Sequence, residues 1–131
     1  MEIITEKFVP SEYEYIMRKK THLGDVRNLQ IYNEANYFQI KKLYDNHELV
    51  GYIAIFLGYN GIESNDVSIE EIVYWGNDIT ILANALISIK NANDYIIPVE
   101  NFYFNENNFP EYLLGAFNKL GFKSGRARWM A

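Results

Sequence analysis

Residues 116–130 read AFNKLGFKSGRARWM, and this stretch decides how the chain closes. Apolar residues at helical spacing lead up to Gly121, which interrupts the pattern. Glycine readily adopts the left-handed conformation that often ends a helix, so we expect a helix that stops at Gly121. Residues 122–130 predict a terminal strand, on which Arg126 and Arg128 share one face because side chains alternate along a strand.

A strand and a helix are predicted in the middle of the chain. Residues 66–75, DVSIEEIVYW, read as a strand with Glu70 on one face and Glu71 on the other, where Glu71 interrupts an apolar row. Residues 79–90 carry the wide apolar stripe of an amphipathic helix. The polar residue Asn77 or Asp78 would cap this helix.

A second strand and helix lead into the closing stretch. Residues 95–104, YIIPVENFYF, predict a strand, and Pro98 cannot donate a hydrogen bond to a neighbouring strand. We therefore expect this strand to lie at an edge or to splay from its neighbour near Pro98. The last helix should open at residues 107–110, because proline is well tolerated in a first turn.

The first half of the chain predicts one strand, one or two helices and a hairpin. Residues 2–9 read as a short strand, and Ser11 is the expected N-cap of the helix that follows. Residues 37–57 alternate on either side of a turn at residues 45–48, which is typical of a β-hairpin. The second hairpin strand is nearly all apolar and should be central. Interleaved strands and helices indicate an α/β (α+β) three-layer fold, in one domain spanning 1–131.

Composition limits the classes of function. The formal charge of −5 makes general nucleic-acid binding unfavourable. The absence of cysteine excludes disulfides and thiolate zinc sites, and we expect no metal site because there are only two histidines. No signal peptide is visible and the longest apolar run is far too short to cross a bilayer, so we expect a cytoplasmic protein that does not bind membranes.

The closing stretch and the order of elements resemble the GNAT superfamily of N-acetyltransferases. Residues 117–122, FNKLGF, are similar to the end of the family's last helix, where a tyrosine and two variable residues precede Leu-Gly-Phe. The resemblance implies a central mixed, mostly antiparallel sheet of about six to seven strands with helices on both faces. It also implies an acyl-CoA-dependent N-acyltransferase that transfers acetyl from acetyl-CoA to a small-molecule amine or a protein substrate.

The resemblance places the cofactor between strands 66–75 and 95–104, with the pyrophosphate at the N-terminus of the helix between them. The sequence departs from the family here, because the loop is short, contains one glycine, and has no preceding Arg or Gln. Asp78 would repel a pyrophosphate, although a capping role explains it fully. The candidate cofactor-binding residues are Val73, Tyr74, Trp75, Gly76, Asn77, Asp78 and Asn108.

Glu70 and Glu71 are the candidate catalytic bases, since a carboxyl on a core-facing row has the raised pKa that a general base needs. The alternative is that one lies on the surface and the other pairs with Arg126 or Arg128. Phe117 stands where the family has its tyrosine and has no hydroxyl to donate. Tyr112 is the candidate replacement, although five residues place it on another side of the helix, where it could be a rim residue.

Two other readings stay open. A chain that has lost catalysis could serve as a binding or protein-interaction module or a homodimer, through aromatic residues of its strands. Those residues are Tyr32, Tyr37, Phe38, Tyr44, Tyr52, Tyr59, Phe102, Tyr103 and Phe104. Alternatively, the topology could be that of another α+β ligand-binding domain, such as a cystatin-like half-barrel.

Overall fold

The computed structural model describes residues 2–58, 65–78, 80–95 and 98–125. Six strands form one sheet in the order β1-β2-β3-β4-β5-β6, with antiparallel pairing from β1 to β4 and parallel pairing from β4 to β6. The strands are β1 Glu2–Thr5, β2 Phe38–Asp45, β3 Glu48–Phe56, β4 Asp66–Tyr74, β5 Asn101–Asn105 and β6 Lys123–Gly125. The predicted mixed, mostly antiparallel sheet is confirmed, and it excludes a cystatin-like half-barrel.

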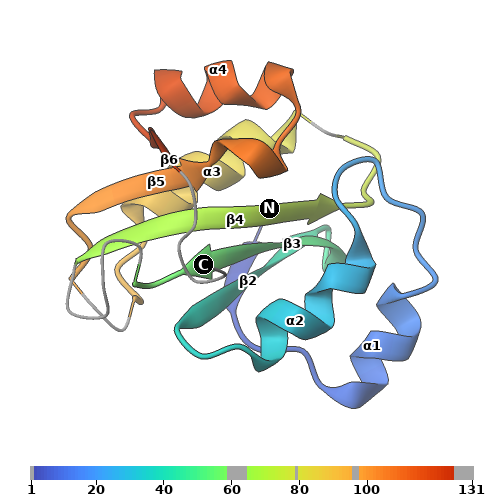
Figure 1. Cartoon of the computed structure of the whole chain (residues 1–131). Helices are drawn as coiled ribbons and strands as arrows, with labels where there is room; N and C mark the ends of the chain where they lie inside the picture. The colour runs from blue at the N-terminus through green and yellow to red at the C-terminus, as the bar shows by residue number, and fades with distance from the viewer. Residues whose placement is uncertain (1, 59–64, 79, 96–97, 126–131) are drawn as a thin grey trace.

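Helices cover both faces of this sheet, as Figure 1 shows. One face packs on α1 and α2, and the other packs on α3 and α4. The helices are α1 Pro10–Ile16, the 3₁₀ turn η1 Val26–Asn28, α2 Leu29–Glu34, α3 Ile81–Asn91, the 3₁₀ turn η2 Glu106–Asn108 and α4 Glu111–Lys119. Among the described helices, none is long and apolar enough to cross a membrane. The three-layer prediction is therefore confirmed.

The hairpin of β2 and β3 forms as predicted. Its turn places Asn46 at φ 51° and His47 at φ 67°. Two consecutive residues at positive φ are typical of the tight turn that matches the twist of antiparallel strands. The apolar part of β3 is buried between β2 and β4, so the prediction of a central strand is also confirmed.

The LGF segment ends α4 in the expected way. Gly121 has φ 87°, its N–H bonds to Asn118 O at 3.1 Å, and the N–H of Phe122 bonds to Phe117 O at 3.0 Å. These two bonds define a Schellman motif. The rings of Phe117 and Phe122 lie 5.4 Å apart and provide the apolar contact that accompanies it. The chain then enters β6, and the rest of the predicted strand, residues 126–130, lies outside the described residues.

Three element boundaries differ from the predictions. The N-cap of α1 is Val9 and not Ser11, because Pro10 already occupies the first helical position. Helix α3 begins at Ile81, two residues later than expected, because a turn anchored on Asp78 comes first.

The third boundary is that of β5, which begins at Asn101 and not at residue 95. Pro98 therefore precedes the strand. β5 is also not an edge strand, since β6 pairs with its outer side.

Candidate functional site

A bulge in β4 decides where its two glutamates point. Ala54 of β3 pairs with Glu71 and Ile55 pairs with Ile69, so Glu70 is the extra residue of a β-bulge. The extra residue shifts the alternation of side chains, and both glutamates face α1 and α2. The prediction of one carboxylate on each face is therefore wrong, because strict alternation does not survive a bulge.

Glu71 is buried beneath η1 and α2. Its carboxylate Oε1 accepts a hydrogen bond of 2.8 Å from Asn28 Nδ2, while Oε2 has no hydrogen-bond partner among the described residues. Burial raises the pKa of Glu71 to about 7, although the bond from Asn28 opposes that rise. A carboxyl with this pKa can both accept and release a proton near neutral pH.

Aromatic hydroxyls surround this carboxyl. Tyr52 of β3 lies opposite Val73 and therefore diagonal to Glu71 on the same face. Burial raises the pKa of Tyr52 and of Tyr32, and the negative charge of Glu71 raises both further. Within the described part of the chain, the hydroxyls of Tyr52 and Tyr13 have no hydrogen-bond partner.

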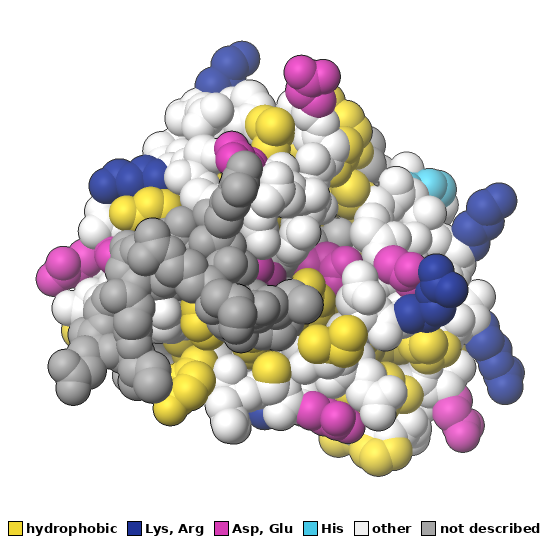
Figure 2. Space-filling model, viewed as in Figure 1, with side chains coloured by type: hydrophobic (Ala, Val, Ile, Leu, Met, Phe, Trp, Pro, Cys, Tyr) yellow, Lys and Arg dark blue, Asp and Glu magenta, His cyan; other side chains and the backbone are white. Residues whose placement is uncertain are grey.

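An opening between α1 and α2 lies next to this cluster. A pocket of about 300 Å³ is lined by Tyr13, together with Pro10, Met17, Arg27 and Gln30. Figure 2 shows acidic side chains near the centre of the face of the molecule that carries α2. Sequence reasoning missed Asn28, Tyr13 and Tyr52 as site residues, because no local pattern brings three distant segments together.

Glu70 has a different environment, in which both oxygens are bonded. Ser68 Oγ donates to Oε2 at 2.5 Å and Asn105 Nδ2 donates to Oε1 at 3.1 Å. Asn108 Nδ2 donates to the backbone oxygen of Glu70 at 2.8 Å. Glu70 thus ties β4 to the end of β5, and Asn108 contributes to the same tie.

β4 and β5 diverge beyond this tie. Their pairing runs from Asp66 with Asn101 to Ile69 with Phe104 and then stops. The splay lies at the C-terminal ends of the two strands, at the opposite end of β5 from Pro98. The expectation of a splay near Pro98 is therefore wrong, because that residue precedes the strand.

At this splay, the edge of β4 that β5 leaves unpaired is covered by the loop between α1 and η1. Trp75 N–H bonds to Val50 O on the β3 side, so the N–H and C=O of Tyr74 point to the opposite edge. There, Tyr74 N–H bonds to Leu23 O at 2.9 Å, and His22 N–H bonds to Tyr74 O at 2.8 Å. In Figure 1 this loop rises beside the arrowhead of β4.

The loop after β4 is bound to its own neighbours. Trp75 Nε1 donates to Leu49 O at 3.0 Å, and the Tyr74 hydroxyl donates to Asp78 O at 2.5 Å. Gly76 is packed so closely that an added Cβ would lie 2.5 Å from that hydroxyl. Asp78 Oδ1 accepts from the N–H of Thr80 at 3.0 Å within the turn that precedes α3. The N-cap of α3 is Thr80, without a side-chain cap bond, so the prediction that Asn77 or Asp78 caps this helix is wrong.

An acyl-CoA molecule does not fit this arrangement as it stands. Its pantetheine arm would need the edge of β4 that residues 22–24 cover, and its pyrophosphate would meet the exposed carboxylate of Asp78. Of the predicted cofactor residues, Val73, Tyr74 and Gly76 are buried, Trp75 is half-buried, and Asn77 and Asp78 are exposed.

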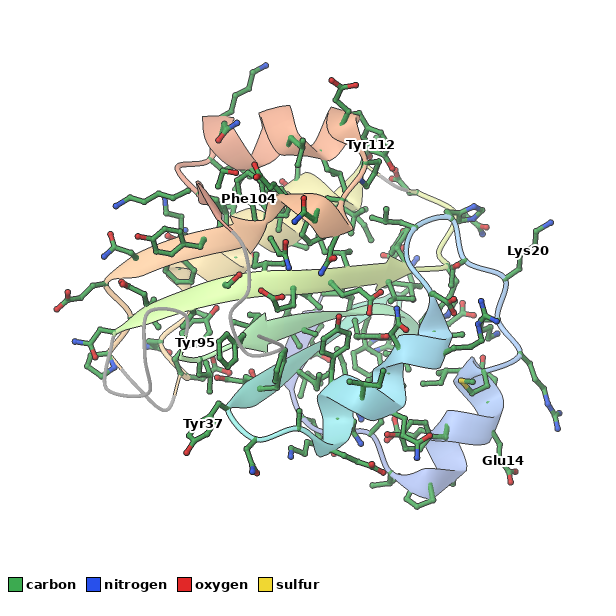
Figure 3. All side chains as sticks on the ribbon, in the orientation of Figure 1. Glu14, Lys20, Tyr37, Tyr95, Phe104 and Tyr112 are labelled. Atoms are coloured by element: carbon green, nitrogen blue, oxygen red, sulfur yellow. The ribbon has the colours of Figure 1, made fainter. Side chains whose placement is uncertain are left out.

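Several other candidate residues lie away from this site. Tyr112 is 63% exposed, and Figure 3 shows it at the solvent side of α4. Phe117 is fully buried and stacks on Phe104 at 4.5 Å, so its ring is a core residue beneath the last pair of β4 and β5. Arg126 and Arg128 lie outside the described residues.

The aromatic residues of the binding-module reading divide between core and surface, and Tyr44, Phe102 and Tyr103 are half-buried. Tyr32, Phe38, Tyr52 and Phe104 are core residues, because each lies on a covered face of a central element. Tyr37 is 49% exposed, and Tyr59 lies outside the described residues.

Comparisons with known proteins agree at the level of structure. No family model and no curated protein matches the sequence. An acetyltransferase from Thermus thermophilus matches 91% of this chain and 84% of its own, with 18% identity and a TM-score of 0.61. A ribosomal-protein-alanine N-acetyltransferase from Brucella melitensis biovar Abortus 2308 matches 99% and 95%, with 13% identity and a TM-score of 0.56.

A third solved structure is an aminoglycoside N-acetyltransferase in complex with CoA. It matches 93% of this chain and 87% of its own, with 14% identity and a TM-score of 0.52. Nearly the whole chain is thus shared with N-acetyltransferases, while identity is low throughout. The chain has the fold of the GNAT N-acetyltransferases.

Proposed function

We propose that the chain is an N-acyltransferase that moves an acyl group from a CoA thioester to a small primary amine, with Glu71 as the general base. The observation that carries the proposal is the buried Glu71 carboxyl, which has one oxygen bonded to Asn28 and the other without a partner among the described residues. The fold supports the reaction class, and the pocket of about 300 Å³ beside Tyr13 favours a small acceptor.

Glu71 would remove a proton from the acceptor nitrogen. With a pKa of about 7, it is largely ionised in slightly basic solution and binds a proton readily. Asn28 fixes the orientation of one carboxylate oxygen, which leaves Oε2 to meet the amine. The hydroxyls of Tyr52 and Tyr13 would orient the acceptor, because buried polar groups without partners favour a ligand that bonds to them.

Acetyl-CoA would supply the acyl group when bound, and Tyr112 as proton donor to its leaving thiolate stays a prediction. The side chain of Tyr112 is exposed, and this exposure favours a minor role.

A second candidate is a GNAT-fold binding module without catalysis. The observation in its favour is the β4 edge, on which residues 22–24 cover the groups that a pantetheine arm would use. The two candidates differ in one respect, since only the enzyme turns over acyl-CoA.

A thiol-release assay separates the two candidates. The protein is incubated with acetyl-CoA and a panel of small primary amines, and free CoA is detected with a thiol reagent. The chain has no cysteine, so the protein itself gives no signal. We expect at least one amine to accelerate CoA release. Equal rates with and without protein for every amine, confirmed by mass spectrometry of the products, would exclude the transferase.

A further inference from the structure

We propose that the loop segment of residues 21–24, which forms a bridge to β4 between Leu23 and Tyr74, closes the acyl-donor opening and leaves the β4 edge when acyl-CoA binds. The inference rests on the proposed function and adds a means of regulation to the same site. The pairing of this loop segment with β4 is then a gate and not a permanent closure.

The chain itself already supplies hydrogen-bond partners at both ends of this edge. Asn108 Nδ2 bonds to Glu70 O at 2.8 Å, and the N–H and C=O of Tyr74 pair with Leu23 and His22. Between them, a Cβ added to Gly24 would clash with Ile72 O, so the backbone of Gly24 lies directly over that carbonyl. An extended ligand that pairs with β4 needs the same groups and therefore competes with residues 22–24.

The loop segment of residues 21–24 makes few contacts with the rest of the chain. Of its four residues, Leu23 alone is buried, at 8% exposed. Within the described part of the chain, its backbone bonds to β4 all involve Tyr74, and the one from Leu23 N–H to Tyr74 O is long at 3.4 Å. Short segments with few buried apolar contacts open at low free energy compared with the core of a sheet.

The loop segment of residues 21–24 can also move as one unit. Thr21 Oγ1 donates to Gly24 O at 2.6 Å and closes a turn within the segment. Gly24 has φ 75°, a conformation in which glycine is not strained. On the other side, Lys20 projects into solvent, as Figure 3 shows, so its side chain does not anchor the segment.

The gate is linked to the proposed base. Asn28, which bonds to Glu71, follows the loop segment of residues 21–24 by only four residues. Release of residues 21–24 would loosen this bond as well, so binding of the acyl donor and the readiness of Glu71 to take a proton are coupled. Coupling of this kind is reciprocal, since each event favours the other equally.

Amide hydrogen exchange of the unmodified protein, followed by NMR, tests the gate. Acetyl-CoA is expected to speed exchange of the His22 amide at least tenfold, because its bond to Tyr74 O is lost. The Tyr74 amide should stay slow, because the ligand replaces Leu23 O as its acceptor. Binding of acetyl-CoA with no change at His22 would overturn the gate and leave the proposed function intact.

A disulfide lock gives a second readout. The double variant Leu23→Cys/Tyr74→Cys replaces two residues that pair directly, at a separation that a disulfide can span. Since the chain has no other cysteine, the reduced form of the same molecule is the matched control. The oxidised form should bind acetyl-CoA at least tenfold more weakly than the reduced form. Equal affinities would contradict the gate, and no binding of acetyl-CoA by the wild type would overturn both the gate and the proposed function.

Discussion

The two sides of β4 differ in how their polar groups are satisfied. On the face toward α1 and α2, Glu71 Oε2 and the hydroxyls of Tyr52 and Tyr13 are buried without partners among the described residues. On the edge toward β5, the chain supplies a partner for the Tyr74 amide and carbonyl. Buried polar groups without partners cost free energy, and they persist where a ligand or water completes them. On the proposed function, the face has polar groups available to an acyl acceptor, whereas the edge would have to open for an acyl donor.

The largest expected loss of activity comes from a substitution of Glu71, on the face of β4 toward α1 and α2. The substitution Glu71→Gln removes the proposed base and keeps the shape of the side chain. We expect the rate of acyl transfer to fall by about 10²–10⁴-fold, the usual contribution of a general base. The rate of CoA release with the best amine of the panel measures this loss.

Glu70→Gln is the matched control for this variant. Both oxygens of Glu70 are bonded, to Ser68 and Asn105, so the substitution should change the rate by about tenfold or less. A larger loss for Glu70→Gln than for Glu71→Gln would reverse the assignment of the base.

The pH dependence of stability is the next largest effect. Folding raises the pKa of Glu71 from 4.5 to about 7, so the folded chain binds more protons than the unfolded chain between these values. The free energy of unfolding should therefore fall as the pH rises from about 4.5 to about 7, by roughly 2–3 kcal/mol from this residue. Glu71→Gln should lose this fall, and urea denaturation of both proteins at pH values of about 4.5 and 7.5 measures it. Parallel pH dependences would show that the environment of Glu71 is not as described.

A smaller effect is expected at the loop after β4. Asp78→Asn removes a negative charge and keeps a side-chain oxygen that can accept the bond from the N–H of Thr80. Affinity for acetyl-CoA should rise about fivefold, because one repulsion on the order of 1 kcal/mol is removed. Calorimetry measures the affinity, with Glu14→Gln as the control because it changes the net charge equally from an exposed position on α1, visible in Figure 3. Equal gains in both variants would point to net charge and not to the loop.

The smallest effect is expected for Tyr112→Phe. The ring is exposed and lies on the solvent side of α4, so the rate of transfer should change less than about twofold. A loss above about tenfold in the same thiol assay would instead assign Tyr112 the role of proton donor.

Much of the fold could be predicted because local patterns agree with it. The hairpin turn at Asn46 and His47 and the helix end at Gly121 follow from backbone geometry that few residues tolerate. The start of β5 was predicted too early, because apolar residues that favour a strand begin before Asn101, where the pairing with β4 starts.

The site was harder to predict because it depends on contacts between distant segments. A carboxylate in an apolar row indicated Glu71 as a candidate base, which stays a prediction, and nothing in the sequence showed the bulge at Glu70. Leu23 and Tyr74 pair although they lie far apart in the sequence, and no periodicity of the short loop predicts their pairing. The loop at Gly76 looked degenerate in the sequence, and the structure shows it packed against Tyr74.

The most direct test of Glu71 as the general base is the pH profile of kcat/KM for acyl transfer. It is best measured with a weakly basic amine, which stays neutral across the range, because the profile then reports the ionisation of the free enzyme. We expect kcat/KM to rise with pH and to level off at about pH 7, which matches the pKa of Glu71. The Glu71→Gln variant should lack this rise. A profile with the same limb in both proteins would contradict the assignment of Glu71 as the base.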